Sequence, residues 1–304
     1  MLFDDVDSFS DYAVQRREHS TGSRFRERQA SMSNASKSTV GASLNLKRLK
    51  EYHELIVGQQ RPVEFQDAAN SGLLDGDWKA ATSEINSLLD GHTAFRGIHG
   101  PFIDLTIGAS DLKIRQAVID RLLQGLEFGA EIGATHMVIH SPTRYLGTNP
   151  YEPPRSVLGL TDEFGSVTAT VEAILPRAQE LNCVIMIENL YDRNPYRLCR
   201  MVESFQSEHV RLSLDTGHAF IASKQGGASP DHWVRLAGEL LGHLHLQDSD
   251  GDADRHWPPG IGDLSWYALF KALEEQAHQP RLIIETFDDP AQGVDWLVKQ
   301  GYTA

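Results

Sequence analysis

The sequence predicts an α/β protein built as a single (β/α)8 barrel, the TIM-barrel fold, preceded by a polar N-terminal extension. Eight short apolar runs of strand length recur along the chain. Each is followed by an amphipathic stretch whose apolar residues recur every three or four positions, as in a helix with one buried face. The 304 residues suit one such domain, which typically needs about 250 residues. Eight alternating units favour a closed barrel over an open sheet.

The predicted strands are continuous apolar runs, which indicates strands buried on both faces of a parallel sheet. They cover residues 38–44, 62–67, 95–101, 136–142, 184–190, 211–218, 242–248 and 281–287. The predicted helices cover residues 46–56, 78–89, 113–133, 168–182, 196–206, 233–241, 266–276 and 289–300. Pro230, between Ser229 and Asp231, is typical of a helix start.

Residues 1–37 are polar and rich in Ser, Arg and Gln, and we interpret them as an extension that is helical in part over residues 12–29. Residues 38–304 then form the catalytic barrel. Two long loops, 143–162 and 249–263, follow strands four and seven. Both are expected at the C-terminal face, where active sites of such barrels lie.

The composition narrows the function. A net charge of −14 argues against a large nucleic-acid footprint, which needs a basic surface. No apolar run approaches the roughly 20 residues of a membrane span, and the first residues lack a signal core, so a cytoplasmic protein is expected. Cys183 and Cys199 are interpreted as free, small core residues.

Polar side chains recur where the predicted strands end. They are His99, His140, Glu188, Asp215, His245 and Glu285. A lone histidine there is usually a hydrogen-bonded packing residue, and a lone carboxylate usually pairs with a cation. These residues converge, however, and no Lys or Arg ends the same strands to neutralise them. A divalent metal is the simplest neutraliser, with Mn, Zn, Co and Mg all compatible.

A second polar group consists of His218, three residues after Asp215, with Asp254 and His256 in the loop after strand seven. These side chains could form another metal site or bind substrate hydroxyls. The alternative is a solvated acidic loop, because the segment DSDGDADRH is mostly charged.

Several motifs resemble the xylose isomerase-like barrel superfamily of sugar isomerases, epimerases and the endonuclease IV family. They are IHGPFIDL (98–105), MVIHSP (137–142), MIENL (186–190), LSLDTGHAF (212–220), the long segment 243–266 and LIIETF (282–287). The resemblance implies one metal, Mn or Zn before Co or Mg, bound by Glu188, Asp215, His245 and Glu285. It also implies that the two glutamates are the catalytic acid and base and that His218 contacts substrate.

The resemblance implies a metal-dependent isomerase or epimerase acting on a ketose, aldose or related keto-sugar. A lyase or hydrolase acting on keto-sugars or keto-acids is one alternative. The other is an endonuclease IV-like zinc phosphodiesterase acting on abasic DNA, in which further ligands complete a three-zinc site. The positions of these further zinc ligands match His99, His140, His218, Asp254 and His256 in this sequence. The net charge and the acidic loop DAANSGLLDGD after strand two weigh against this reading.

Other side chains are candidates for contact with the substrate. Phe102 and Trp257, together with Tyr145 and Tyr151, could form an apolar wall, although the first two could also simply pack. Arg193, Arg144 and Arg155 could bind a phosphate or carboxylate, with ordinary surface charge as the alternative. A small sugar-derived partner is expected, no membrane, and a homo-oligomer is compatible with the extension. The sequence leaves open the sugar, the reacting carbon and whether one or three metals bind.

Overall fold

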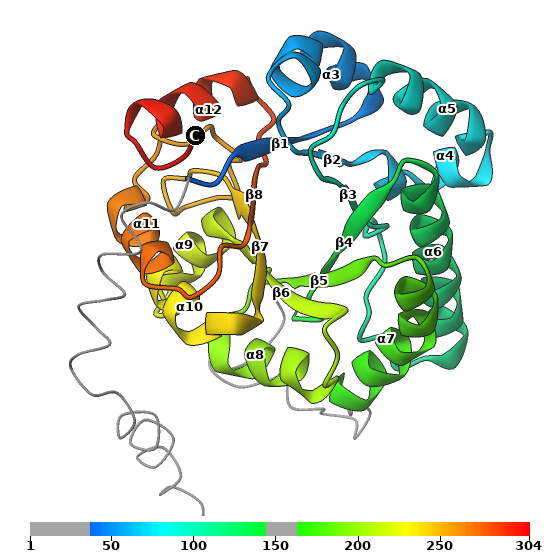
Figure 1. The fold of residues 1–304 in the computed structure, drawn as a ribbon. Coiled ribbons are helices and arrows are strands. Elements are labelled where there is room, and N and C mark those ends of the chain that lie inside the picture. Colours follow the sequence, from blue (N-terminus) through cyan, green and yellow to red (C-terminus); the bar gives the residue numbers. More distant parts are fainter. Residues whose placement is uncertain (1–36, 144–162) are drawn as a thin grey trace, which may run out of the picture. The chain divides into compact units, whose positions relative to one another are not determined.

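The computed structural model describes residues 37–143 and 163–304, and residues 38–304 contain a closed barrel of eight parallel strands ringed by helices (Figure 1). The strands pair in chain order, and β1 pairs with β8 to close the barrel. They are β1 Val40–Leu44, β2 Val63–Phe65, β3 Arg96–His99, β4 Ala134–His140, β5 Val184–Glu188, β6 Val210–Asp215, β7 Leu241–Leu246 and β8 Arg281–Ile284. The predicted fold class and all eight predicted strands are confirmed.

The helices lie outside the strands. They are α3 Leu46–Glu51, α4 Ser71–Asp75, α5 Trp78–Leu88, α6 Leu112–Glu131, α7 Glu163–Glu180, α8 Pro195–Ser204, α9 Thr216–Lys224, α10 Pro230–Ala237, α11 Trp266–Glu274 and α12 Pro290–Lys299. Every predicted helix is found, with shifted ends. Helix α10 begins at Pro230 as predicted, whereas the 46–56 stretch divides into α3 and a π-helical turn at Glu54–Gly58.

Several predicted strand ends lie beyond the observed ones, and one of these differences bears on function. The strand predicted over 211–218 ends at Asp215, and α9 begins at once with Thr216. The carboxylate of Asp215 accepts a hydrogen bond from the backbone N–H of His218 at 2.6 Å and so caps this helix. His218 therefore lies in the first turn of a helix, not on a strand.

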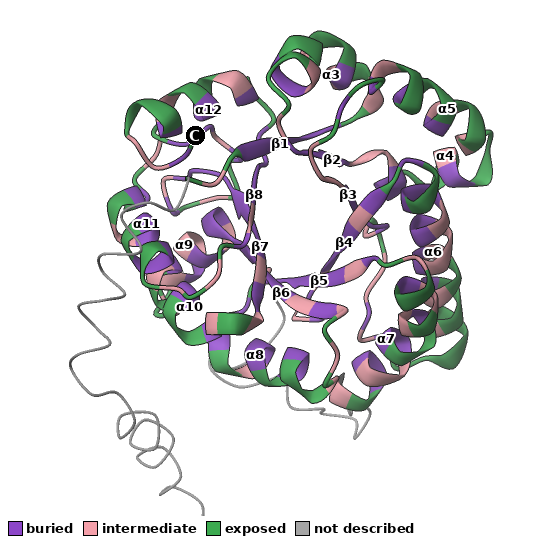
Figure 2. Ribbon diagram, in the orientation of Figure 1, coloured by how far each residue is buried: buried purple, intermediate pink, exposed green. Residues whose placement is uncertain are grey.

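Burial follows the layers of the barrel. The strands are buried almost throughout, and most helices turn one face to them and the other to solvent, whereas α9 is buried or half-buried except at Lys224 (Figure 2). The side chains of Phe65, Phe128 and Trp233 are fully buried in the main core, and both cysteines are buried and free, as predicted. Within 37–143 and 163–304, no helix combines the length and apolar character that crossing a bilayer requires.

Some sequence predictions fall outside the described residues. They concern the extension over 1–36 with its helical part at 12–29, and the loop residues Arg144, Tyr145, Tyr151 and Arg155. The division of the chain after residue 37 stays a prediction.

Candidate metal centre

Four predicted ligands lie together at the C-terminal end of the barrel. Glu188 ends β5, Asp215 ends β6, His245 lies on β7, and Glu285 directly follows β8. The register places Asp215 beside His245. One ligand atom from each side chain lies within 4.8 Å of the others, and all four residues are buried. We call this group the central site.

Hydrogen bonds hold the central site together. Nδ1 of His245 lies 2.7 Å from Oε1 of Glu188 and 3.4 Å from Oε2 of Glu285. Gln66, just after β2, donates from Nε2 to the other oxygen of Glu285 at 2.8 Å. The ring nitrogen Nδ1 of His245 therefore faces both glutamates.

Several negatively charged groups are crowded together in the central site, and this shifts the pKa values of its side chains. Burial, reinforced by the nearby Glu188 and Glu285, raises the pKa of Asp215 to about 6. Burial opposes a charge on His245, but Glu285, Glu188 and Glu64 outweigh it and hold the pKa of this imidazole well above its usual value. Burial also opposes a charge on Glu188, yet His245 holds its pKa well below the usual range. In the metal-free protein, His245 is thus the cation that the carboxylates attract.

The central site fits a divalent cation. Three carboxylates and one imidazole are a donor set that binds ions such as Mn or Zn. Oε2 of Glu188 is buried without a hydrogen-bond partner, and a buried polar atom of this kind is costly unless something satisfies it. A metal bound by the four side chains would satisfy that oxygen and replace the proton of His245.

A second group shares Glu188 and consists of His99 at the end of β3 and His140 at the end of β4. Each Nε2 lies 3.6 Å from Oε2 of Glu188, and the two Nε2 atoms are 3.1 Å apart. Nδ1 of His99 donates to the carbonyl oxygen of Gly100 at 3.0 Å, which orients Nε2 toward Glu188. Burial opposes a charge on His99, but Glu188 raises the pKa of this ring. Burial and the neighbouring His99 lower the pKa of His140 to about 3, which leaves the His140 ring neutral.

A third group consists of His218, Asp254 and His256. Nε2 of His218 and Nε2 of His256 lie 3.3 Å and 3.1 Å from the same Asp254 oxygen. Nδ1 of His218 donates to the carbonyl oxygen of Asn189 at 3.0 Å, which directs Nε2 of the same ring at Asp254. Burial opposes a charge on His256, but Asp254 and Glu285 raise its pKa to about 9. These three residues form a defined cluster rather than a freely solvated acidic loop.

The loop that carries Asp254 and His256 is fixed by Asp248. The carboxylate accepts hydrogen bonds from the backbone N–H of Gly260 (2.9 Å) and Leu264 (3.2 Å) and from Nε1 of Trp266 (2.8 Å). The backbone of Asp248 also pairs with Trp257. Both ends of the loop are therefore tied to one buried side chain.

The three predicted substrate contacts occupy different settings. Phe102 packs against His99 and His140, with ring centroids 4.6 Å apart in both pairs. The ring of Trp257 lies under the guanidinium of Arg255. Arg193 donates to Gln225 at the C-terminal end of α9, about 10 Å along that helix from His218, so its visible contact is structural. The substrate roles of all three stay predictions.

Sequence reasoning missed several polar residues around the site. Gln247 donates to both Asp215 and Asp254, and Glu64 on β2 contacts His245. Phe287, 72% exposed, packs its ring 4.4 Å from that of His256. Gln247 lies two positions after His245, and side chains two apart on a strand share a face, so that spacing was an available signal.

Sequence relatives match parts of the chain. An uncharacterized protein of Methanocaldococcus jannaschii is 22% identical over 197 residues, covering 62% of this chain and 63% of that protein. D-psicose 3-epimerase of Enterocloster bolteae is 32% identical over 116 residues, 36% of each chain. The chain therefore spans less than two thirds of the length of the curated relatives it matches.

Solved structures match almost the whole barrel. A Thermus thermophilus protein soaked with ZnCl2 is 25% identical, with a TM-score of 0.66, over 86% of this chain and 97% of that one. A D-tagatose 3-epimerase-like protein is 19% identical, with a TM-score of 0.70, over 87% and 96%. At 19% identity, the similarity to this second structure supports a shared fold and not a shared activity. A model of the xylose isomerase-like TIM barrel family matches residues 54–300, and the chain belongs to that family.

Proposed function

We propose that the protein is a metal-dependent sugar isomerase or epimerase with its metal at the central site. The observation that supports this most is the convergence of Glu188, Asp215, His245 and Glu285 within 4.8 Å in a buried position. Proteins with a similar fold include a D-psicose 3-epimerase and a D-tagatose 3-epimerase-like protein, and a D-psicose 3-epimerase matches part of the sequence. The substrate class is accordingly a ketose, an aldose or a related keto-sugar.

Proton transfer next to a carbonyl is the chemistry that this geometry suits. A divalent ion at the central site supplies Lewis acidity to a substrate carbonyl. Glu188 and Glu285 come from opposite sides of His245, and each carboxylate can accept or donate a proton. One carboxylate removes the proton from the carbon next to the carbonyl and keeps it, and the other, which carries a proton of its own, delivers that proton to the opposite face or to the neighbouring carbon.

Other residues would orient the sugar and limit access of water. His218 and His256 lie beside the central site and can hydrogen-bond substrate oxygens. Phe102 covers His99 and His140 with an apolar ring. Exclusion of water strengthens the electrostatic interactions on which a carboxylate base and a bound cation depend.

Exchange of substrate hydrogen with solvent tests this proposal. The full chain, loaded separately with Mn, Co or Zn, is incubated with a ketose panel in D2O, and NMR follows deuterium entry at the carbon next to the carbonyl. Wild type should incorporate deuterium and form an epimer or isomer, and Glu285→Gln should lose at least 100-fold in rate. Glu127→Gln, which removes a surface partner of Arg177, is the matched control. No exchange with any sugar in the panel contradicts the proposal, and a dehydrated product identifies a lyase.

A zinc phosphodiesterase is the second candidate, favoured by one observation. The two flanking clusters, His99–His140–Glu188 and His218–Asp254–His256, are complete and adjoin the central site. Three neighbouring cations held in this way could bind a phosphate and activate a water molecule.

Metal counting and a cleavage assay distinguish the candidates. The phosphodiesterase predicts three zinc ions per chain and nicking of a duplex that contains an abasic site. The isomerase predicts one tightly held ion and no nicking. His99→Ala should abolish nicking in the first case and leave the central ion bound in the second.

A further inference from the structure

A layer of polar side chains lies beneath the central site, inside the barrel. Ser43, Glu64, His136, Ser213 and His243 are each at most 2% exposed. The interior of such a barrel is normally filled by bulky apolar residues, and burial of an ionised carboxylate is costly unless it is paired. Glu64 is fully buried among histidines, so its presence demands a physical explanation.

The carboxylate of Glu64 contacts three histidines, because Nε2 of His243 lies 3.3 Å from Oε2, and it bridges His136 on β4 to His245 on β7. Oε1 lies 2.8 Å from Nε2 of His245, and Oε2 lies 2.9 Å from Nε2 of His136. The hydroxyl of Ser43 donates to Oε1 at a longer 3.4 Å. Glu64 is thus the shared acceptor between β4 and β7.

The hydrogen bonds fix which nitrogen of each ring carries a proton. The guanidinium of Arg281 can only donate, and Nη1 lies 2.6 Å from Nδ1 of His136. Nδ1 of His136 is therefore the acceptor, and Nε2–H donates to Glu64. By the same reasoning, the carboxylate of Glu64 requires a proton on Nε2 of His245. Nδ1, which faces Glu188 and Glu285, is then the nitrogen whose proton a metal would replace.

We propose that Glu64 is a positioning residue that holds His245 with Nδ1 directed at the metal of the central site. Nδ1 is the atom that faces Glu188 and Glu285, at 2.7 Å and 3.4 Å. A carboxylate behind a metal-bound imidazole fixes the tautomer and the ring plane and makes the ligand more basic. The inference rests on the metal centre proposed above, but it concerns a residue of β2 that lies outside the four ligands.

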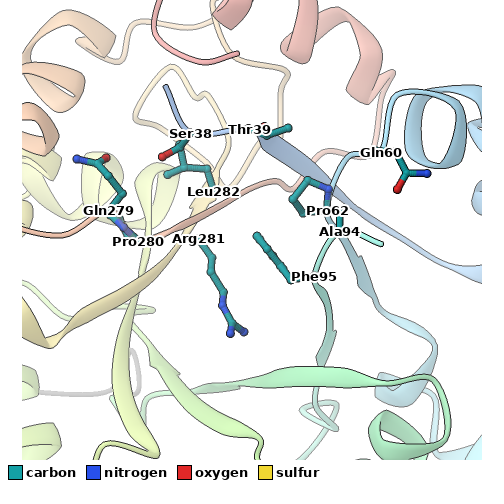
Figure 3. A pocket seen from close by; sticks show the side chains of 10 residues that line it. All are labelled: Ser38, Thr39, Gln60, Pro62, Ala94, Phe95, Gln279, Pro280, Arg281 and Leu282. Carbon is teal, nitrogen blue, oxygen red and sulfur yellow. The ribbon is translucent and has the colours of Figure 1, made fainter. Parts of the chain in front are cut away.

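Two neighbours of His136, Gly97 and Arg281, support this arrangement. His136 fits inside the barrel because Gly97 faces it: a Cβ at Gly97 would lie 1.9 Å from the His136 ring. Arg281 extends inward from a pocket of about 360 Å³ at the N-terminal end of the strands, next to Phe95 (Figure 3). A continuous path of hydrogen bonds therefore runs from Arg281 through His136 and Glu64 to His245. Arg281, at the start of this path, also supplies positive charge that offsets part of the charge of Glu64.

The test measures metal binding, not turnover. Zn and Mn dissociation constants of the full chain are determined by competition with a chromogenic chelator. Glu64→Gln keeps the shape but places an amide N–H₂ against one of the two histidine N–H groups, so the dissociation constant at the central site should rise about 10- to 100-fold. Ser43→Ala removes the weak contact to the same carboxylate and should change the constant less than about threefold. Circular dichroism verifies that both variants fold.

A second measurement gives the geometry directly and needs no variant. In the zinc-loaded wild type with ¹⁵N-labelled histidine, long-range ¹H–¹⁵N spectra should show His245 protonated at Nε2 and metal-bound at Nδ1. Zinc on Nε2 of His245 overturns the inference, as does unchanged affinity in folded Glu64→Gln. If Asp215→Ala binds as tightly as wild type, the proposed metal centre is wrong, which is a distinguishable failure.

Discussion

Gln247 links two of the clusters: its Nε2 lies 2.8 Å from Oδ1 of Asp254. The same amide nitrogen lies 3.2 Å from Asp215 in the central site, and the side-chain oxygen accepts the backbone N–H of His256. A Cβ at Gly217 would collide with this side chain, so the start of α9 leaves room for it. One amide therefore sets the spacing between the central site and the cluster His218–Asp254–His256.

Replacement of Gln247 by Met should separate those two sites. Met is of similar size but leaves buried donors and acceptors without partners, at a cost of about 1–3 kcal/mol in the free energy of unfolding. Any metal bound at Asp254 should be lost before the one in the central site. Urea unfolding and metal counting on the same sample test this. Equal loss from both sites would contradict the linking role.

Asp248→Asn should free the loop over residues 249–265. The carboxylate accepts several N–H groups while buried, and an amide would set a donor against at least one of them. We expect a loss of about 2–4 kcal/mol in stability and faster cleavage within the loop by a protease. Asp263→Asn, in the same loop, is the control. Unaltered proteolysis of Asp248→Asn would exclude the anchoring role.

Metal affinity should increase with pH in two stages. Between pH 7 and 8, the metal must displace the proton of His245. Burial lowers the pKa of this imidazole, but the surrounding glutamates have the larger effect and hold the pKa well above its usual value. Below pH 6, Asp215 also carries a proton, because burial raises its pKa to about 6. The logarithm of the dissociation constant should therefore fall by about one for each unit of pH increase above pH 7. Below pH 6 this slope should approach two per pH unit. Titrations from pH 5 to 8 test this.

Chelation of the metal should lower thermal stability. Removal of the ion leaves Glu188, Asp215 and Glu285 crowded in a buried site. A ligand present at 100 times its dissociation constant stabilises the folded state by about 2.7 kcal/mol, and calorimetry with and without EDTA should show a difference of several degrees. Asp215→Ala should be insensitive to EDTA, and equal sensitivity would place the stabilising metal elsewhere.

Phe287→Ala should weaken substrate binding and leave metal affinity unchanged. The ring packs at a tilt against that of His256 and is largely exposed, which suits a wall that a sugar ring contacts. We expect KM to rise by about 3- to 30-fold with a small change in kcat, because the lost contact stabilises the bound substrate and the transition state equally. Phe287→Leu should restore part of the affinity. A large fall in kcat with unchanged KM would contradict this role.

The sequence carried enough information for the fold because the barrel repeats one pattern eight times. It also located the residues of all three clusters, since each lies at or just after a strand end or in the loop after β7. Side chains deeper in the barrel were missed because a polar residue inside a short run, such as Glu64 in PVEF, is compatible with either face of a strand. His243 was within reach, because it lies two residues before His245 and shares its face.

The boundary between β6 and α9 could not be predicted from apolar patterning. In the segment LSLDTGHAF the four residues at the junction, DTGH, are polar or glycine, so apolar spacing gives no boundary there. The capping of the helix by Asp215 is visible only when strand and helix are both placed. The same carboxylate contributes to the central site, so one residue has both a structural and a chemical role.

The hydrogen bonds by which Asp248 holds the loop 249–265 also have a consequence for evolution and protein engineering. Both ends of the loop 249–265 converge on this residue, whereas Glu188, His245 and Glu285 belong to the rigid strand ends. The loop can therefore be exchanged as a cassette between the Asp248 and Trp266 contact points while the barrel stays intact. Chimeras cut at those two positions offer a route to altered substrate selectivity without redesign of the ring of strands.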